Sequence, residues 1–146
     1  MRLATYTDYT LRVLIYLAVH RERRVTIEEI AEAYAISRNH LMKVVHHLGR
    51  AGLAITTRGR SGGICLGPEP DTISIGRIAR DCEADSALVE CFGPSNTCRI
   101  TPVCQLRSAL SQANEAFFKV LDGYTLADIT QPQAPLRRLL HEGPLQ

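Results

Sequence analysis

The sequence lacks any apolar run long enough to cross a membrane. Its longest such run, Val13 to Val19, has seven residues, whereas a membrane-spanning helix needs about 20. A secretion signal is also missing, because Asp8 and Arg12 interrupt the N-terminal segment and no small-residue cleavage site follows it. These absences predict a cytoplasmic protein with no membrane partner. The 146 residues suffice for one ordinary domain, or for one small domain with a short further element.

Acidic residues are absent between Glu32 and Glu69, a stretch that contains five Lys and Arg residues and three histidines. Residues 1–67 carry ten Lys and Arg against five Asp and Glu, whereas residues 68–146 carry seven against ten. A basic surface without carboxylates favours contact with phosphate groups, because a misplaced acid repels a polyanion. The alternative is a solvated basic face that has no nucleic-acid partner.

Three helices are predicted in the first half of the chain. Apolar residues recur at helical spacing in residues 7–20, 27–34 and 37–51. Thr26, with Glu29 three residues later, forms the capping-box pattern that begins the second helix.

Two short strands follow, at residues 53–57 and 64–66. The segment between them contains three glycines and two arginines, which predicts a flexible and basic hairpin tip. Three helices followed by such a hairpin is the order of a winged helix-turn-helix. We therefore expect residues 1–70 to form a DNA-binding domain in a mainly α protein with one small β-hairpin.

The third helix and the hairpin carry the side chains best suited to contact DNA. Arginine and asparagine can bond bidentately to guanine and adenine edges, and the first turn of a helix attracts phosphate. Arginines on a hairpin can enter the minor groove or lie on the phosphates. The predicted DNA-binding residues are Ser37, Arg38, Asn39, His40 and Lys43 on the helix, and Arg58, Gly59, Arg60 and Ser61 on the hairpin.

The second half of the chain predicts a long dimerisation helix. A short helix and a cysteine-bearing loop are expected in residues 71–100, and the long helix with its cap in residues 101–130. Apolar residues in the long helix follow alternating steps of three and four, as in a coiled-coil seam; they are Val103, Leu106, Leu110, Ala113, Phe117 and Val120. This seam could pack on its own chain, but pairing with a second copy is favoured, because two identical heads can bind two half-sites. Residues 131–146 contain three prolines and are predicted to be a flexible tail.

Five cysteines are present, an odd number in a chain without an export signal, which argues against a disulfide framework. Cys65 and Cys82 are interpreted as structural thiols. Cys91, Cys98 and Cys104 are separated by six and five intervening residues, many of them polar or turn-forming. Three thiolates on a loop suit zinc or an iron–sulfur cluster, and the absence of paired C-x2-C knuckles favours the cluster. No Cys–His–Asn arrangement is evident, so we expect no enzyme.

Several separate motifs, in this order, resemble those of the NsrR-type nitric-oxide-sensing repressors, within the group that also includes IscR and RirA. The resemblance covers residues 1–130. It rests on Met1-Arg2-Leu3 with Thr7-Asp8-Tyr9, Ser37 to Lys43, Arg58 to Gly63, Cys98 to Cys104, and Asp122 to Asp128.

The resemblance implies a homodimeric winged-helix repressor with one iron–sulfur cluster in each subunit. Cys91, Cys98 and Cys104 would be its cysteine ligands, and Asp8 of the partner subunit would be the fourth ligand of a 4Fe-4S cluster. Nitric oxide would attack the cluster, and the dimer would then release its double-stranded DNA operator. The alternative is an iron- or redox-sensing regulator of the IscR/RirA type with a 2Fe-2S cluster. That branch has a histidine three residues after the last cysteine, where this chain has Arg107.

Overall fold

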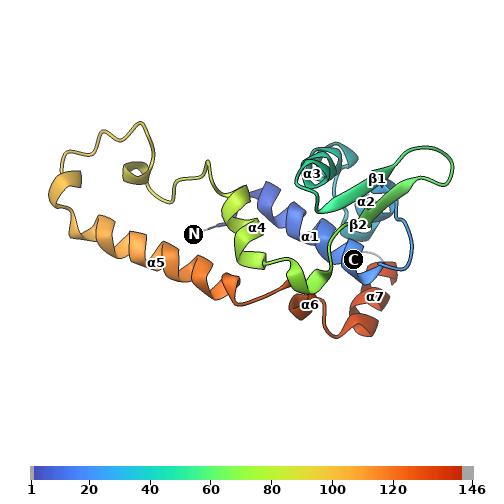
Figure 1. Cartoon of the computed structure of the whole chain (residues 1–146). Helices are drawn as coiled ribbons and strands as arrows, with labels where there is room; N and C mark the ends of the chain where they lie inside the picture. Colours follow the sequence, from blue (N-terminus) through green and yellow to red (C-terminus); the bar gives the residue numbers. More distant parts are fainter. Residues whose placement is uncertain (1, 143–146) are drawn as a thin grey trace.

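The computed structural model describes residues 2–142 and confirms a mainly helical protein with one small antiparallel hairpin. The elements are α1 (Thr5–Val19), α2 (Ile27–Tyr34), α3 (Arg38–Arg50), β1 (Ala54–Thr57), β2 (Gly63–Leu66), α4 (Ile75–Cys82), α5 (Gln105–Asp122), α6 (Leu126–Ile129) and α7 (Gln133–Glu142), with short 3-10 turns at Pro70–Thr72, Glu90–Phe92 and Thr101–Val103. Figure 1 shows a body that contains α1–α3, the hairpin, α6 and α7, from which α5 projects like an arm. Within residues 2–142, no helix combines the length and apolar character needed to span a bilayer.

Helix α1 lies at the centre of the body and packs against α3, α4, α6, α7 and β2. Its residues Val13 and Leu14 are fully buried, as is Leu41 on the facing side of α3. Burying one such side chain contributes about 1.5–3 kcal/mol. The central helix therefore positions the helix-turn-helix, the hairpin and the start of the arm around one core.

The starts of α2 and α3 are set by local caps. The Glu29 amide donates to the Thr26 hydroxyl at 3.2 Å, and the Thr26 amide donates to the Glu29 carboxylate at 2.6 Å. The Ser37 hydroxyl accepts from the His40 amide at 3.3 Å and begins α3. The predicted capping box and the predicted cap of the third helix are both confirmed.

Ala35, which ends α2, is the one non-glycine residue with a positive φ among those described, at φ 53° and ψ 43°. This left-handed conformation costs a residue with a Cβ roughly 1 kcal/mol or more, whereas glycine adopts it freely. We expect Ala35→Gly to raise the free energy of unfolding by about 0.5 kcal/mol, measured by urea denaturation. Ala51 has an ordinary φ of −77°, so Ala51→Gly should lower stability instead. Equal effects of the two substitutions would contradict this account.

The hairpin pairs Ala54 with Leu66 at its base and Thr57 with Gly63 at its tip. Val25 adds an isolated bridge, because its amide and carbonyl both bond to Ile64, at 2.9 and 2.7 Å. This bridge anchors β2 to the segment before α2. The wing, residues 58–62, is thereby held beside the helix-turn-helix.

The arm is fastened to the body where α4 meets α5. The Arg80 guanidinium bonds to both Glu115 carboxylate oxygens, at 2.9 and 3.1 Å, and to Asp122 at 2.9 Å. Gly76 allows the helices to approach closely, since a Cβ there would meet Asp122 Oδ1 at 2.0 Å. The remainder of α5 extends away from the body (Figure 1).

Helix α5 begins at Gln105, four residues later than the sequence pattern indicated. Thr101–Val103 forms a 3-10 turn, with Pro102 inside it. Cys104 has an extended backbone, and its sulfur accepts the Arg107 amide at 3.3 Å. Cys104 therefore caps the helix instead of lying within its first turn.

The predicted flexible tail differs from the structure, because α7 occupies Gln133–Glu142 and packs on α1 and α2. Arg137 bonds to the Val19 carbonyl at the end of α1 and pairs with Glu22 at 3.3 Å. The sequence-based prediction missed this helix because the contacts that hold it join residues far apart in the chain. The part of that prediction that falls on residues 143–146 lies outside the described residues.

Candidate functional site

Apart from Asp8 on α1, the predicted site residues lie on two surfaces: the outer face of α3 with the wing, and the loop between α4 and α5. On α3, the apolar stripe Leu41, Val44, Val45 and Leu48 is buried. This stripe turns the opposite face to solvent. The predicted residues Ser37, Arg38, Asn39, His40 and Lys43 are all exposed there.

Two of these side chains have neighbours within the chain. Arg38 pairs with Glu28 of α2 at 2.5 Å, and both side chains are more than half exposed. The His40 ring lies 5.7 Å from the ring of Tyr9. An exposed ion pair of this kind contributes little stability, so Arg38 can exchange Glu28 for another anion at low cost.

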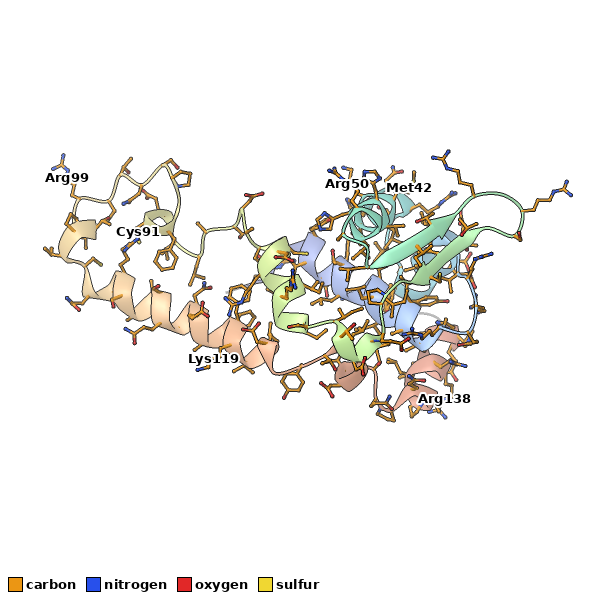
Figure 2. All side chains as sticks on the ribbon, viewed as in Figure 1. Met42, Arg50, Cys91, Arg99, Lys119 and Arg138 are labelled. Carbon is orange, nitrogen blue, oxygen red and sulfur yellow. The ribbon has the colours of Figure 1, made fainter. Side chains whose placement is uncertain are left out.

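The exposed face of α3 extends one turn beyond the predicted set. Met42, His46 and Arg50 are exposed as well, and Figure 2 shows Met42 and Arg50 at the same outer edge of the molecule. The sequence already indicates Arg50, like Lys43, as a phosphate contact. Helical spacing could also have found His46, which lies three residues after Lys43 and four before Arg50.

The wing contains the remaining predicted DNA-binding residues, and all four, Arg58, Gly59, Arg60 and Ser61, are exposed. Gly59 has φ 100°, a conformation that favours glycine. Arg24, from the segment between α1 and α2, donates to the Ser61 carbonyl at 3.1 Å. Arg24 was not among the predicted residues, because a contact across 37 positions leaves no local sequence signal.

The three cysteines lie on the segment between α4 and α5, and Figure 2 shows Cys91 beside the outer part of the arm. Cys91 is in the 3-10 turn Glu90–Phe92, Cys98 is exposed, and Cys104 caps α5. All three thiols are free of disulfides. The loop therefore presents three available soft ligands from one segment.

Hydrogen bonds shape this loop from within. The Glu90 carboxylate accepts from the Thr97 amide at 2.9 Å and from the Thr97 hydroxyl at 2.7 Å, and these bonds hold the pKa of Glu90 below its usual value. Arg107 donates to the Cys91 carbonyl at 3.4 Å. Arg107 thus links the first and last cysteine segments, since its amide also bonds to the Cys104 sulfur.

The chemistry of the loop suits a soft metal centre, but its geometry is open. Cysteine sulfur is a soft ligand of the kind that binds iron–sulfur clusters. Within residues 2–142, however, no three Cys, His, Asp or Glu side chains stand close enough together to hold a metal ion. The residue types fit an iron–sulfur cluster, and the loop has to draw its three thiols together to bind one.

The other two cysteines lie in the body. Cys65 is in β2, and its sulfur faces the Ile55 carbonyl at 3.9 Å. Cys82 ends α4 and packs against the core, where burial raises the pKa of its thiol. Both positions agree with the structural role that the sequence predicted for them.

Asp8 lies in the first turn of α1 and forms an ion pair with Arg12 at 3.0 Å. The start of α1 is fixed by Glu83, which accepts from the Ala4 amide at 2.8 Å and from the Thr7 hydroxyl. Asp8 therefore belongs to the body, while Cys91 lies at the end of the arm (Figures 1 and 2). Among the described residues, Asp8 and the three cysteines form no common metal-binding cluster.

Comparison with known proteins identifies the family of this chain. A family model, Rrf2, described as an iron-dependent transcriptional regulator, matches residues 3–132. The chain belongs to the Rrf2 family. It is therefore a transcriptional regulator, and the expectation that it is not an enzyme is confirmed.

Relatives named HTH-type transcriptional regulator NsrR match nearly the whole chain. The protein from Geobacillus kaustophilus is 50% identical over 144 residues, which cover 97% of this chain and 98% of the relative. The protein from Bacillus subtilis is 49% identical over 142 residues, which cover 96% and 97%. The resemblance drawn from the short motifs is thereby confirmed.

Solved structures of the Rrf2 type share the fold. CymR, the global cysteine regulator of B. subtilis, superposes with a TM-score of 0.68 at 30% identity and covers 88% of this chain and 95% of its own. The IscR of T. potens gives a TM-score of 0.71 at 26% identity and covers 100% and 93%. The predicted winged helix-turn-helix is confirmed.

Proposed function

We propose that this Rrf2 regulator is a cytoplasmic, homodimeric repressor that binds double-stranded DNA operators and releases them in response to nitric oxide. The observation that carries the proposal is the division of the chain into two parts. An exposed basic face, α3 with the wing, lies on the body, and three free cysteines lie at the end of an arm with an uncovered apolar seam.

DNA binding is supported by charge and shape. The exposed face of α3 presents Lys43 and Arg50, the wing presents Arg58 and Arg60, and no acidic residue lies between Glu32 and Glu69. A helix of this kind fits the major groove, and an adjoining basic wing reaches the minor groove or the phosphates. The roles of Ser37, Arg38, Asn39, His40, Gly59 and Ser61 in DNA contact belong to the same proposal.

Dimerisation is supported by the seam of α5. Leu106 and Val120 on this helix are 64 and 63% exposed, and Val103, in the 3-10 turn just before it, is 78% exposed. Such exposure is costly for aliphatic side chains on a projecting helix. A second copy of the same helix covers such a stripe in a two-fold dimer. Pairing also brings two basic heads into one molecule.

The iron–sulfur site is proposed at Cys91, Cys98 and Cys104, with Asp8 of the partner subunit as the fourth ligand. We favour one 4Fe-4S cluster in each subunit, because Arg107, at the position of the histidine in the IscR type, already bonds to the Cys91 carbonyl. A bound cluster would supply iron that nitric oxide can attack. Without a cluster ligand role, the Asp8 carboxylate has Arg12 of its own chain as a partner, because the two side chains pair at 3.0 Å.

Binding measurements on oxygen-protected protein test this function. We expect iron and sulfide in near-equal amounts, and tight binding to a selected duplex that falls at least tenfold after exposure to nitric oxide. The binding constant should also fall steeply with salt, because phosphate contacts release counterions. Zinc in place of iron, or an affinity that nitric oxide leaves unchanged, would contradict the proposal. An affinity that responds to iron supply or oxygen but not to nitric oxide would favour the IscR/RirA type.

A further inference from the structure

One large apolar side chain, Met42, is exposed on the outer face of α3, where its neighbours are polar or basic. Its exposed fraction is 53%, and among the described residues it is not part of the hydrophobic core. The core residues of α3 are Leu41, Val44, Val45 and Leu48. Folding of the chain therefore gives no reason for an apolar residue at this position.

The neighbours of Met42 are the residues best placed to contact base edges. Arg38 and Asn39 precede it by four and three positions, and His46 follows by four, so all three flank it on the helix surface. Figure 2 shows Met42 at the outer edge of α3, near Arg50. Any duplex that accepts this helix in its major groove brings Met42 to the base edges as well.

The chemistry of the major groove offers one apolar group, the C5 methyl of thymine. Resting on the proposed DNA binding, we propose that Met42 is a specificity-determining residue that contacts a thymine methyl in each operator half-site. The methionine side chain is unbranched and polarizable, so it can adjust its rotamer to pack against the methyl group. The basic residues Lys43 and Arg50 on the same face favour a polyanion over an apolar protein partner.

Deoxyuracil substitution tests this contact directly, because deoxyuridine differs from thymidine only by the missing methyl. A duplex selected from a random pool by the wild-type protein serves as the probe, and each thymine is replaced in turn at constant salt. We expect one thymine in each half-site at which the replacement weakens wild-type binding by about fourfold, the value for one buried methyl-sized group. Replacing both symmetry-related thymines should weaken it by about 15-fold.

The Met42→Ala variant should bind the thymine duplex more weakly and lose the uracil penalty at that position alone. Met42→Leu should retain part of the penalty, because it keeps an apolar side chain. Leu139→Ala is the matched control: Leu139 is 51% exposed but lies on α7, so this variant should keep the full penalty.

The outcomes separate this inference from the proposed function. If the wild-type protein binds a selected duplex but Met42→Ala shows the same uracil penalty at every thymine, the Met42 contact is wrong and DNA binding stands. If Met42→Ala weakens binding without any change in the uracil profile, Met42 contacts sugar or phosphate instead, and the inference again fails. If no duplex is bound at all, both proposals fall.

Discussion

Cys98→Ala is expected to yield a folded protein that contains no bound iron or sulfide. Cys98 is exposed, and its hydrogen bonds within the loop use backbone atoms. Its amide donates to the Asn96 side chain at 2.9 Å, and its carbonyl accepts from the Thr101 hydroxyl at 2.8 Å. Removing the thiol therefore leaves the loop contacts intact and deletes one of three proposed thiolate ligands. The visible absorbance of oxygen-protected protein should fall to background, and iron analysis should give values near zero.

Cys65→Ala is the matched control for this experiment. Cys65 lies in β2, on the body and away from the arm, so its loss should leave iron, sulfide and absorbance unchanged. The same samples can be tested for nitric oxide response, which Cys98→Ala should lack. A Cys98→Ala protein with the iron content of the wild type would show that the three cysteines have been misassigned.

The elements that depend on neighbouring residues could be predicted from the sequence alone. The helix at Ile27–Tyr34 agrees with its predicted bounds because Thr26 and Glu29 cap each other across one turn. The hairpin was predicted from the glycines between two short β-like runs. Helix α5 was placed too early because a proline such as Pro102 suits a 3-10 turn as well as the first turn of an α-helix. The residue that caps the helix is a cysteine, which is not a usual N-cap residue.

Contacts between distant residues left no such signal. Helix α7 contains a proline in its first turn, and its place depends on Arg137 bonding to Val19, 118 positions earlier. The hydrogen bond from the Ala4 amide to Glu83, which holds the start of α1, joins residues 79 positions apart. The ion pair of Asp8 with Arg12, by contrast, follows from their spacing of four on one helix.

The candidate site was predicted unevenly for a related reason. Polar and basic residues on α3 were found because charge and helical spacing agree, whereas Met42 escaped a search for polar contacts. The three cysteines were found by their types and spacing, but the sequence could not show that the thiols stand apart in a single chain. The proposed cluster would require the loop to draw the thiols together and a second subunit to supply Asp8, and a local sequence pattern encodes neither.

Replacing Leu106 and Val120 together with glutamate is expected to convert the proposed dimer into monomers. Both side chains are exposed in the single chain, so the substitutions leave the core of the body untouched and act on the α5 seam alone. The two-fold interface would contain each glutamate once from each subunit, and unpaired buried charges cost several kcal/mol. We expect the dissociation constant of the dimer to rise by about 1000-fold or more, measured by analytical ultracentrifugation.

Loss of the dimer should also weaken DNA binding and iron retention, because one operator then meets a single head and the partner's Asp8 is absent. Leu139→Glu provides the control, since it adds a charge to an equally exposed aliphatic position on α7, outside the seam. Thermal unfolding of the double variant should remain cooperative, because Val13, Leu14 and Leu41 still form the core of the body. A double variant that stays dimeric with unchanged affinity would place the interface elsewhere and leave the seam of α5 without a partner.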